Sequence, residues 1–245
     1  MKAWVKILLA LLVLCRSGRS QGFVNLNFER AVIVHDPSGG YPGSSYASNA
    51  IPGWTAYISG VPQTDIIYND YPLAAPAVTL QGTNSGLFPA VQGKYFVMLW
   101  GEFNPNNYPD YETNTAAIGQ TGQIPLSAQS LTFWGTIGGM QATFNGQPID
   151  FLVTGGTANY NIYAANISAY AGQTGQLLFT DPCYGNTFGG PSTIDNIQFS
   201  STAVPEPSTF ALAALGGLLL GFRGWRNYSR WACFDKTDRE VESFG

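Results

Sequence analysis

The stretch QATFNGQPIDFLV, residues 141–153, decides the fold class. Its apolar residues alternate with polar ones or run continuously for only a few positions, which is typical of short β-strands. Asn145-Gly146 separates two such runs, and this dipeptide readily adopts the positive φ angles of a tight hairpin turn. The stretch therefore predicts antiparallel strands joined by a two-residue turn.

Similar runs recur along the chain and are separated by prolines and glycines. They predict about eight strands, at residues 23–28, 77–80, 95–100, 131–134, 141–144, 149–153, 176–179 and 194–199. No segment shows sustained helical periodicity, and residues 164–171 allow at most one helical turn. We therefore expect an all-β protein, an antiparallel β-sandwich of jelly-roll type, whose strand order the sequence leaves open.

The amino terminus has the pattern of a secretory signal peptide. Lys2 and Lys6 lead an apolar core, residues 7–14, which small and polar residues follow. Residues 1–20 are therefore predicted to be removed on export, and the mature chain would begin at Gln21. Cys15 leaves a lipidated amino terminus as an alternative.

The carboxy-terminal region has three parts in a defined order. Val204-Pro205-Glu206-Pro207 is followed by an apolar run, residues 210–222, and then by Arg223, Arg226 and Arg230. Prolines prevent regular structure, an apolar run enters lipid, and cations beside such a run resist translocation. The run is shorter than the 20 or so residues that a membrane span needs, so we expect a marginal or tilted helix. A buried helix of the globular domain is the alternative.

This tripartite region resembles the PEP-CTERM sorting signal of bacterial surface proteins. The resemblance implies an exosortase, a membrane transpeptidase-like protease, as the processing partner and Val204, Pro205, Glu206 and Pro207 as the sorting motif. It also implies a chain held transiently in the inner membrane and then displayed at the cell surface or in the extracellular matrix. The expected organisation is a signal peptide (1–20), a β-sandwich (21–200), a linker with the sorting motif (201–209), a membrane segment (210–222) and a basic flank with a cytoplasmic tail (223–245).

The predicted exported part is strongly acidic. Residues 21–204 contain ten acidic and two basic residues, a net charge of about −8, whereas the whole chain carries −4. So few cations cannot neutralise phosphates, which excludes nucleic acid as a partner. The composition suits calcium or neutral glycans better as partners.

Cys183 is the one cysteine in the predicted exported part, so no disulfide within the domain is possible.

Four short motifs resemble the galactose-binding-domain-like jelly rolls, which include many carbohydrate-binding modules. They are Asn27-Phe28-Glu29, Ile51-Pro52-Gly53-Trp54, residues 93–97 and residues 194–199. The resemblance implies one structural calcium ion that joins the first and last strands, with Glu29 and Asp195 as ligands. Calcium takes oxygen ligands, so these carboxylates suit it. Alternatively, Glu29 pairs with Arg30 or faces water, and Asp195 accepts a hydrogen bond within a turn.

An irregular loop, residues 101–117, carries the mixture of groups that binds glycans. Aromatic rings stack on sugars, while amides and carboxylates bind hydroxyls. The candidate glycan-binding residues are Tyr108, Asp110, Tyr111 and Glu112. An exposed surface turn is the alternative, and residues 68–71 are a second candidate for a glycan site.

Catalysis has little support in the sequence. His35, the only histidine, follows no nucleophile motif and stands beside Asp36 in a glycine-rich loop. A glycosidase needs paired carboxylates, and the one close acidic group in the sequence consists of Glu102, Asp110 and Glu112.

We therefore expect a non-enzymatic surface or matrix protein with a structural or adhesive role. A carbohydrate-binding module that retains extracellular polysaccharide is the alternative, and a glycosidase is the weakest hypothesis.

Overall fold

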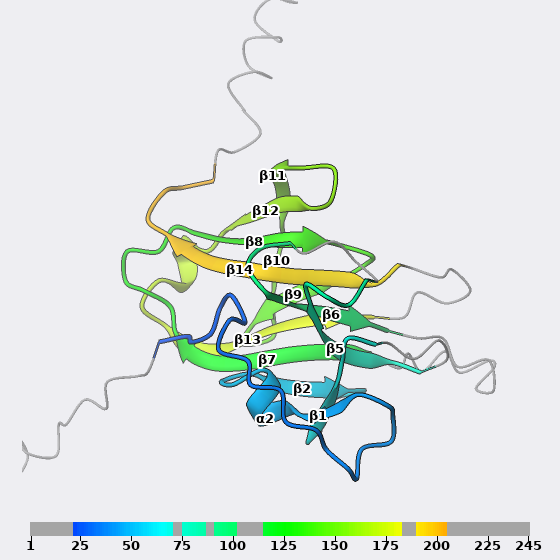
Figure 1. Cartoon of the computed structure of the whole chain (residues 1–245). Helices are drawn as coiled ribbons and strands as arrows, with labels where there is room; N and C mark the ends of the chain where they lie inside the picture. The colour runs from blue at the N-terminus through cyan, green and yellow to red at the C-terminus, as the bar shows by residue number, and fades with distance from the viewer. Residues whose placement is uncertain (1–21, 71–74, 87–90, 102–114, 183–189, 205–245) are drawn as a thin grey trace, which may run out of the picture. The chain divides into compact units, whose positions relative to one another are not determined.

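The computed structural model describes residues 22–70, 75–86, 91–101, 115–182 and 190–204 (Figure 1). The chain divides into two units, Met1–Val204 and Pro205–Gly245, and every described residue belongs to the first. The predicted signal peptide, membrane segment and cytoplasmic tail lie outside the described residues. No helix of the described part is long and apolar enough to cross a membrane.

The first unit contains two β-sheets. The larger has the order β1-β4-β5-β6-β14-β8-β12-β11, and the smaller has the order β10-β9-β13-β7-β2-β3. The bounds in the larger sheet are β1 Ser44–Tyr46, β4 Asp65–Tyr68, β5 Ala77–Gly82, β6 Tyr95–Trp100, β14 Ser192–Ser200, β8 Ser130–Thr136, β12 Asn161–Asn166 and β11 Leu152–Gly156. Those in the smaller sheet are β10 Gln147–Ile149, β9 Gln141–Phe144, β13 Thr174–Asp181, β7 Ala116–Gln123, β2 Thr55–Ile58 and β3 Val61–Gln63.

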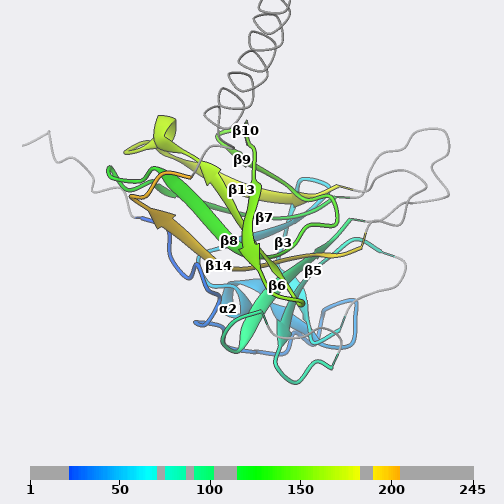
Figure 2. The same ribbon diagram turned by 90° about the horizontal axis from the view of Figure 1, so that it is seen from above.

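The two sheets form a sandwich, which confirms the predicted fold class (Figures 1 and 2). The chain passes from one sheet to the other along β6, β7, β8 and β9, as in a jelly roll. Strand pairs are antiparallel except for β4 and β5, which are parallel. The described helices are one short α-helix, α2 (Ala47–Ala50), and a 3-10 turn at Ser168–Tyr170, in agreement with the absence of helical periodicity.

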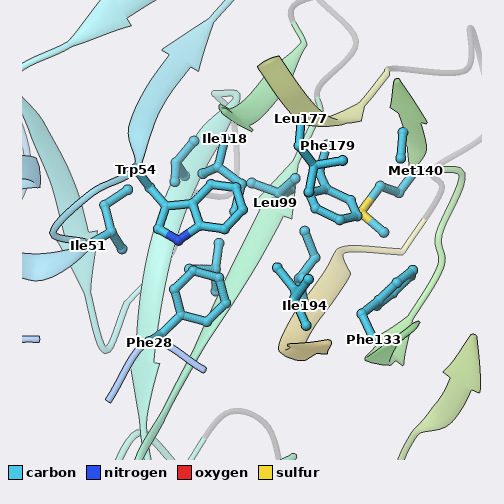
Figure 3. Close-up of a cluster of buried hydrophobic side chains, with 14 of the residues drawn as sticks. Phe28, Ile51, Trp54, Leu99, Ile118, Phe133, Met140, Leu177, Phe179 and Ile194 are labelled. Carbon is cyan, nitrogen blue, oxygen red and sulfur yellow. The ribbon is translucent and has the colours of Figure 1, made fainter. Parts of the chain in front are cut away.

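Aromatic and aliphatic side chains from both sheets fill the space between them (Figure 3). Trp54 lies 5.7 Å from Phe28 and 6.3 Å from Phe179, measured between ring centroids, and its indole Nε1 donates to the Asn25 carbonyl oxygen at 3.1 Å. Phe133 from the larger sheet meets Phe179 edge-on at 5.6 Å. Alternate residues of β13 are buried, as a strand with one face on a core requires.

The hairpin predicted at Asn145-Gly146 is confirmed. Phe144 pairs with Gln147, and both turn residues have positive φ, 50° and 76°. The single strand predicted over residues 149–153 is wrong, because Ile149 ends β10 in one sheet and Leu152 begins β11 in the other. Phe151, between them, is half-buried and packs against Phe133 at 4.9 Å, so the apolar run marks a crossover between the edge strands of the two sheets.

The strand predicted over residues 23–28 is also wrong. Val24 forms its backbone hydrogen bonds with the side chain of Gln120, which takes the place of a neighbouring strand. Asn25 and Phe28 then have φ of 51° and 56°, which no regular strand allows. The other predicted runs correspond to β5, β6, β8, β9, β13 and β14.

Candidate functional site

Glu29 lies in the turn that follows Phe28 and reaches the start of β6. Its Oε1 accepts hydrogen bonds from the backbone N–H groups of Lys94 at 2.6 Å and Tyr95 at 3.1 Å. Gly93 has a φ of 63°, and a Cβ added there would collide with the Glu29 carboxylate. Glycine therefore suits this position, because another residue would be strained at this φ and would displace the Glu29 carboxylate.

Asp195 lies on β14 and is completely buried. Its Oδ1 accepts the Asn196 N–H at 2.6 Å, whereas its Oδ2 has no hydrogen-bond partner among the described residues. Burial raises the pKa of Asp195 to about 8, and the nearby charge of Glu29 raises it too, although the N–H groups of Asn196 and Gln92 act in the opposite direction. The structure thus places the two predicted calcium ligands near enough for the charge of Glu29 to act on Asp195.

The described residues give these carboxylates no compensating cation. Arg30 and Lys94, the only arginine and lysine in the described part, are exposed, and no ion pair joins either of them to Glu29 or Asp195. The alternative pairing of Glu29 with Arg30 is therefore not observed. No described group contains three His, Cys, Asp or Glu side chains, so a bound cation would need backbone carbonyls or water for its remaining ligands.

A residue with a left-handed backbone conformation adjoins each of the two carboxylate residues in the sequence. Phe28 precedes Glu29 with a φ of 56°, and Asn196 follows Asp195 with a φ of 47°. Positive φ is uncommon for a bulky residue such as phenylalanine and persists only where the surroundings enforce it. The buried Phe28 ring against Trp54 and the hydrogen bond from Ile197 N to Leu26 O, 2.9 Å, supply that enforcement. These flanking positions were not predicted, because only tertiary contacts impose them.

The other predicted residues do not gather into a catalytic group within the described part. Tyr108, Asp110, Tyr111 and Glu112 lie outside the described residues, as do Glu102 and Cys183. The His35 ring bonds the Ser44 carbonyl through Nδ1 at 3.1 Å. Hydrogen bonds from the hydroxyl and N–H of Ser38 lower the pKa of Asp36, so His35 and Asp36 both belong to a structured loop.

The structure also contains a pocket that the sequence did not predict. Its volume is about 230 Å³, and Tyr41, Gln63 and Asp65 supply polar groups around an apolar floor. The rest of its lining is Gly40, Ile58, Ile66, Ile67, Pro76, Ala77 and Val78. These residues are scattered in the sequence, which is why no motif indicated them.

Comparison with known proteins identifies the carboxy-terminal region. Residues 203–227 match the PEP-CTERM protein-sorting motif, which contains the predicted residues Val204, Pro205, Glu206 and Pro207. No curated protein and no solved structure matches the chain. The chain therefore carries a PEP-CTERM sorting signal, which implies processing by an exosortase and export to the cell envelope or surface.

A second buried carboxyl, that of Asp181, lies at the end of β13 in the smaller sheet. Burial raises the pKa of Asp181 to about 6, while hydrogen bonds from Ser192 and Gly101 lower it. The folded state therefore holds this proton at pH values where the unfolded chain has lost it. This group's contribution to stability is complete below pH 4 and is lost as the pH rises through 6.

We expect Asp181→Asn to remove that dependence. Between pH 4 and pH 7 the wild-type domain should lose about 2–3 kcal/mol more unfolding free energy than the variant. Urea unfolding of residues 21–204 at each pH measures the difference. The exposed Asp150→Asn is the matched control and should follow the wild type. Parallel pH curves for Asp181→Asn and the wild type would contradict the prediction.

Proposed function

We propose that the protein is a structural or adhesive component of the cell surface or extracellular matrix. The order of its parts carries this proposal. The last strand, β14, ends at Ser200, and the sorting motif begins at residue 203. The complete sandwich therefore precedes the signal, so processing near Pro205-Glu206-Pro207 would deliver an intact folded domain. Any role after sorting falls to that acidic domain.

We expect Glu206→Ala to block this delivery. In cells that contain the exosortase, the wild-type protein at the surface should begin near Gln21 and lack everything after the Pro-Glu-Pro region, as mass spectrometry of its peptides would show. The variant should stay in the membrane fraction with its tail attached. Glu240→Ala, which removes an acidic residue from the tail, is the control. Peptides from residues 234–245 in the mature wild-type protein would contradict processing.

A structural calcium ion at Glu29 and Asp195 would suit this role, and we include it in the proposal. The support is the buried, unpartnered Oδ2 of Asp195 beside a second carboxylate with no cationic side chain paired to either. Calcium would supply the missing charge and bind the amino-terminal turn to the last strand. Backbone groups that already hold Glu29 would keep its carboxylate in place.

We expect calcium to stabilise residues 21–204. At about a hundredfold excess over its dissociation constant, a ligand of the folded state adds about 2.7 kcal/mol. For a domain of this size that raises the melting temperature by about 5–10 °C. A chelator should reverse the shift, and Asp195→Asn should abolish it, while Asp150→Asn should respond as the wild type does. An unchanged melting temperature on chelation would show that Asp195 holds a proton instead.

Carbohydrate binding is the second candidate, favoured by the pocket at Tyr41. An exposed aromatic ring, a carboxylate and an amide around an apolar floor are the groups that bind a sugar ring and its hydroxyls. In this case the protein would retain extracellular polysaccharide at the surface. The predicted loop with Tyr108, Asp110, Tyr111 and Glu112 is the competing location.

A glycan array with the exported domain tests both locations. If the pocket is the site, Tyr41→Ala should weaken binding by about tenfold or more, because hot-spot aromatic residues contribute that much. Tyr46→Ala is the matched control, since Tyr46 is 37% exposed and Tyr41 is 44% exposed. Loss of binding in Tyr108→Ala or Tyr111→Ala, with Tyr41→Ala unchanged, would place the site in the loop. Absence of binding to any glycan would contradict the second candidate.

A further inference from the structure

Three of the four sheet edges in the described domain are protected against pairing with another strand. The edge strands β3 and β10 contain Pro62 and Pro148, which lack the N–H donor that a new strand would need. The edge of β1 is covered by the preceding segment, since Tyr46 N donates to Val34 O at 3.1 Å and Asp36 N to Ser44 O at 2.9 Å. Proteins commonly protect edges in these ways.

The fourth edge, β11, is different. It pairs with β12 on one side, and Figure 1 shows it at the end of its sheet. All five residues, Leu152 to Gly156, are exposed, and none is charged or a proline. Leu152 and Val153 are 46% and 60% exposed. The edge has one interruption, a bulge between Val153 and Gly155, which leaves Thr154 outside the ladder with β12 and bends the strand there.

The distribution of charge favours contact at this edge between copies of the domain. Between Glu112 and Asp181 the chain has a single charged residue, Asp150. In contrast, the opposite end of the larger sheet, at β1 and β4, carries Asp36, Asp65 and Asp70 close to its strands. Two acidic domains that met there would repel each other, whereas two that met at β11 would bring together from residues 113–180 only the exposed Asp150 of each copy.

We propose that β11 is a self-association site, where it pairs antiparallel with β11 of a second copy around a two-fold axis. An axis near Thr154, the bulged residue, brings the Leu152–Val153 end of one strand alongside the Gly155–Gly156 end of its partner. The two larger sheets then become continuous. The inference is independent of calcium and of glycan binding, and it requires only the folded sandwich.

The pairing is short, so its affinity is low and it depends on local concentration. Molecules displayed together on a surface meet at a high effective concentration, which favours weak homotypic contacts. Self-association of this kind would connect neighbouring copies directly. It would give the matrix protein proposed above a physical means of cohesion.

Sedimentation equilibrium of residues 21–204, which contain every described strand, tests the proposal. The wild type should show a concentration-dependent monomer–dimer equilibrium at physiological salt. Val153→Lys should weaken dimerisation by about tenfold or more, because it places two like charges across the axis. Val61→Lys is the matched control: Val61 is also 60% exposed, but it lies on the edge that Pro62 protects, so dimerisation should be unchanged.

A crosslink provides a second measurement that does not depend on affinity. In a Cys183→Ser background, Thr154→Cys should form disulfide-linked dimers on mild oxidation, and Val61→Cys should not. Circular dichroism and melting temperatures confirm that each variant is folded. A wild type that stays monomeric at all concentrations would overturn the proposal. Equal dimerisation of Val153→Lys and Val61→Lys would overturn it as well, because the contact would then lie elsewhere.

Discussion

The amino-terminal turn, residues 24–30, closes one end of the sandwich, and the rest of the structure depends on how it is held. Val24 bonds the Gln120 side chain on β7 in the smaller sheet, and Leu26 accepts the N–H of Ile197 on β14 in the larger one. Phe28 covers Trp54 in the core between the sheets. Because the turn bonds both sheets at once, it fixes their spacing here and places Glu29 beside the start of β6.

That placement explains why two carboxylates meet in a domain with so few cations. Asp195 is on the last strand, and Glu29 is held near it by backbone N–H groups that its charge attracts. Burial destabilises the ionised form of Asp195. A bound proton or a bound cation can offset this free-energy cost. The same scarcity of basic residues leaves no described ion pair at Asp195 to provide this charge.

Much of the fold could be predicted because its signals are local. Tyr95–Trp100 is a continuous apolar run and forms β6, while Asn145-Gly146 forms its hairpin because that dipeptide tolerates positive φ. β7 was missed, since its sequence AAIGQTGQ is built of small and polar residues and becomes a central strand only through its neighbours. The strand predicted over residues 149–153 was wrong, because an apolar run does not reveal that the chain leaves one sheet and enters the other within it.

The sequence by itself determined the sorting region, the acidic charge and the all-β class, because each follows from the order and type of neighbouring residues. Glu29 and Asp195 were also named from short motifs. Only the tertiary structure decided that these two residues lie near each other, that Tyr41 and Asp65 share a pocket, and that β11 is a sheet edge without a proline, a charge or a covering segment. Those features depend on strand order, which is set by packing between residues distant in the chain and leaves no local signal.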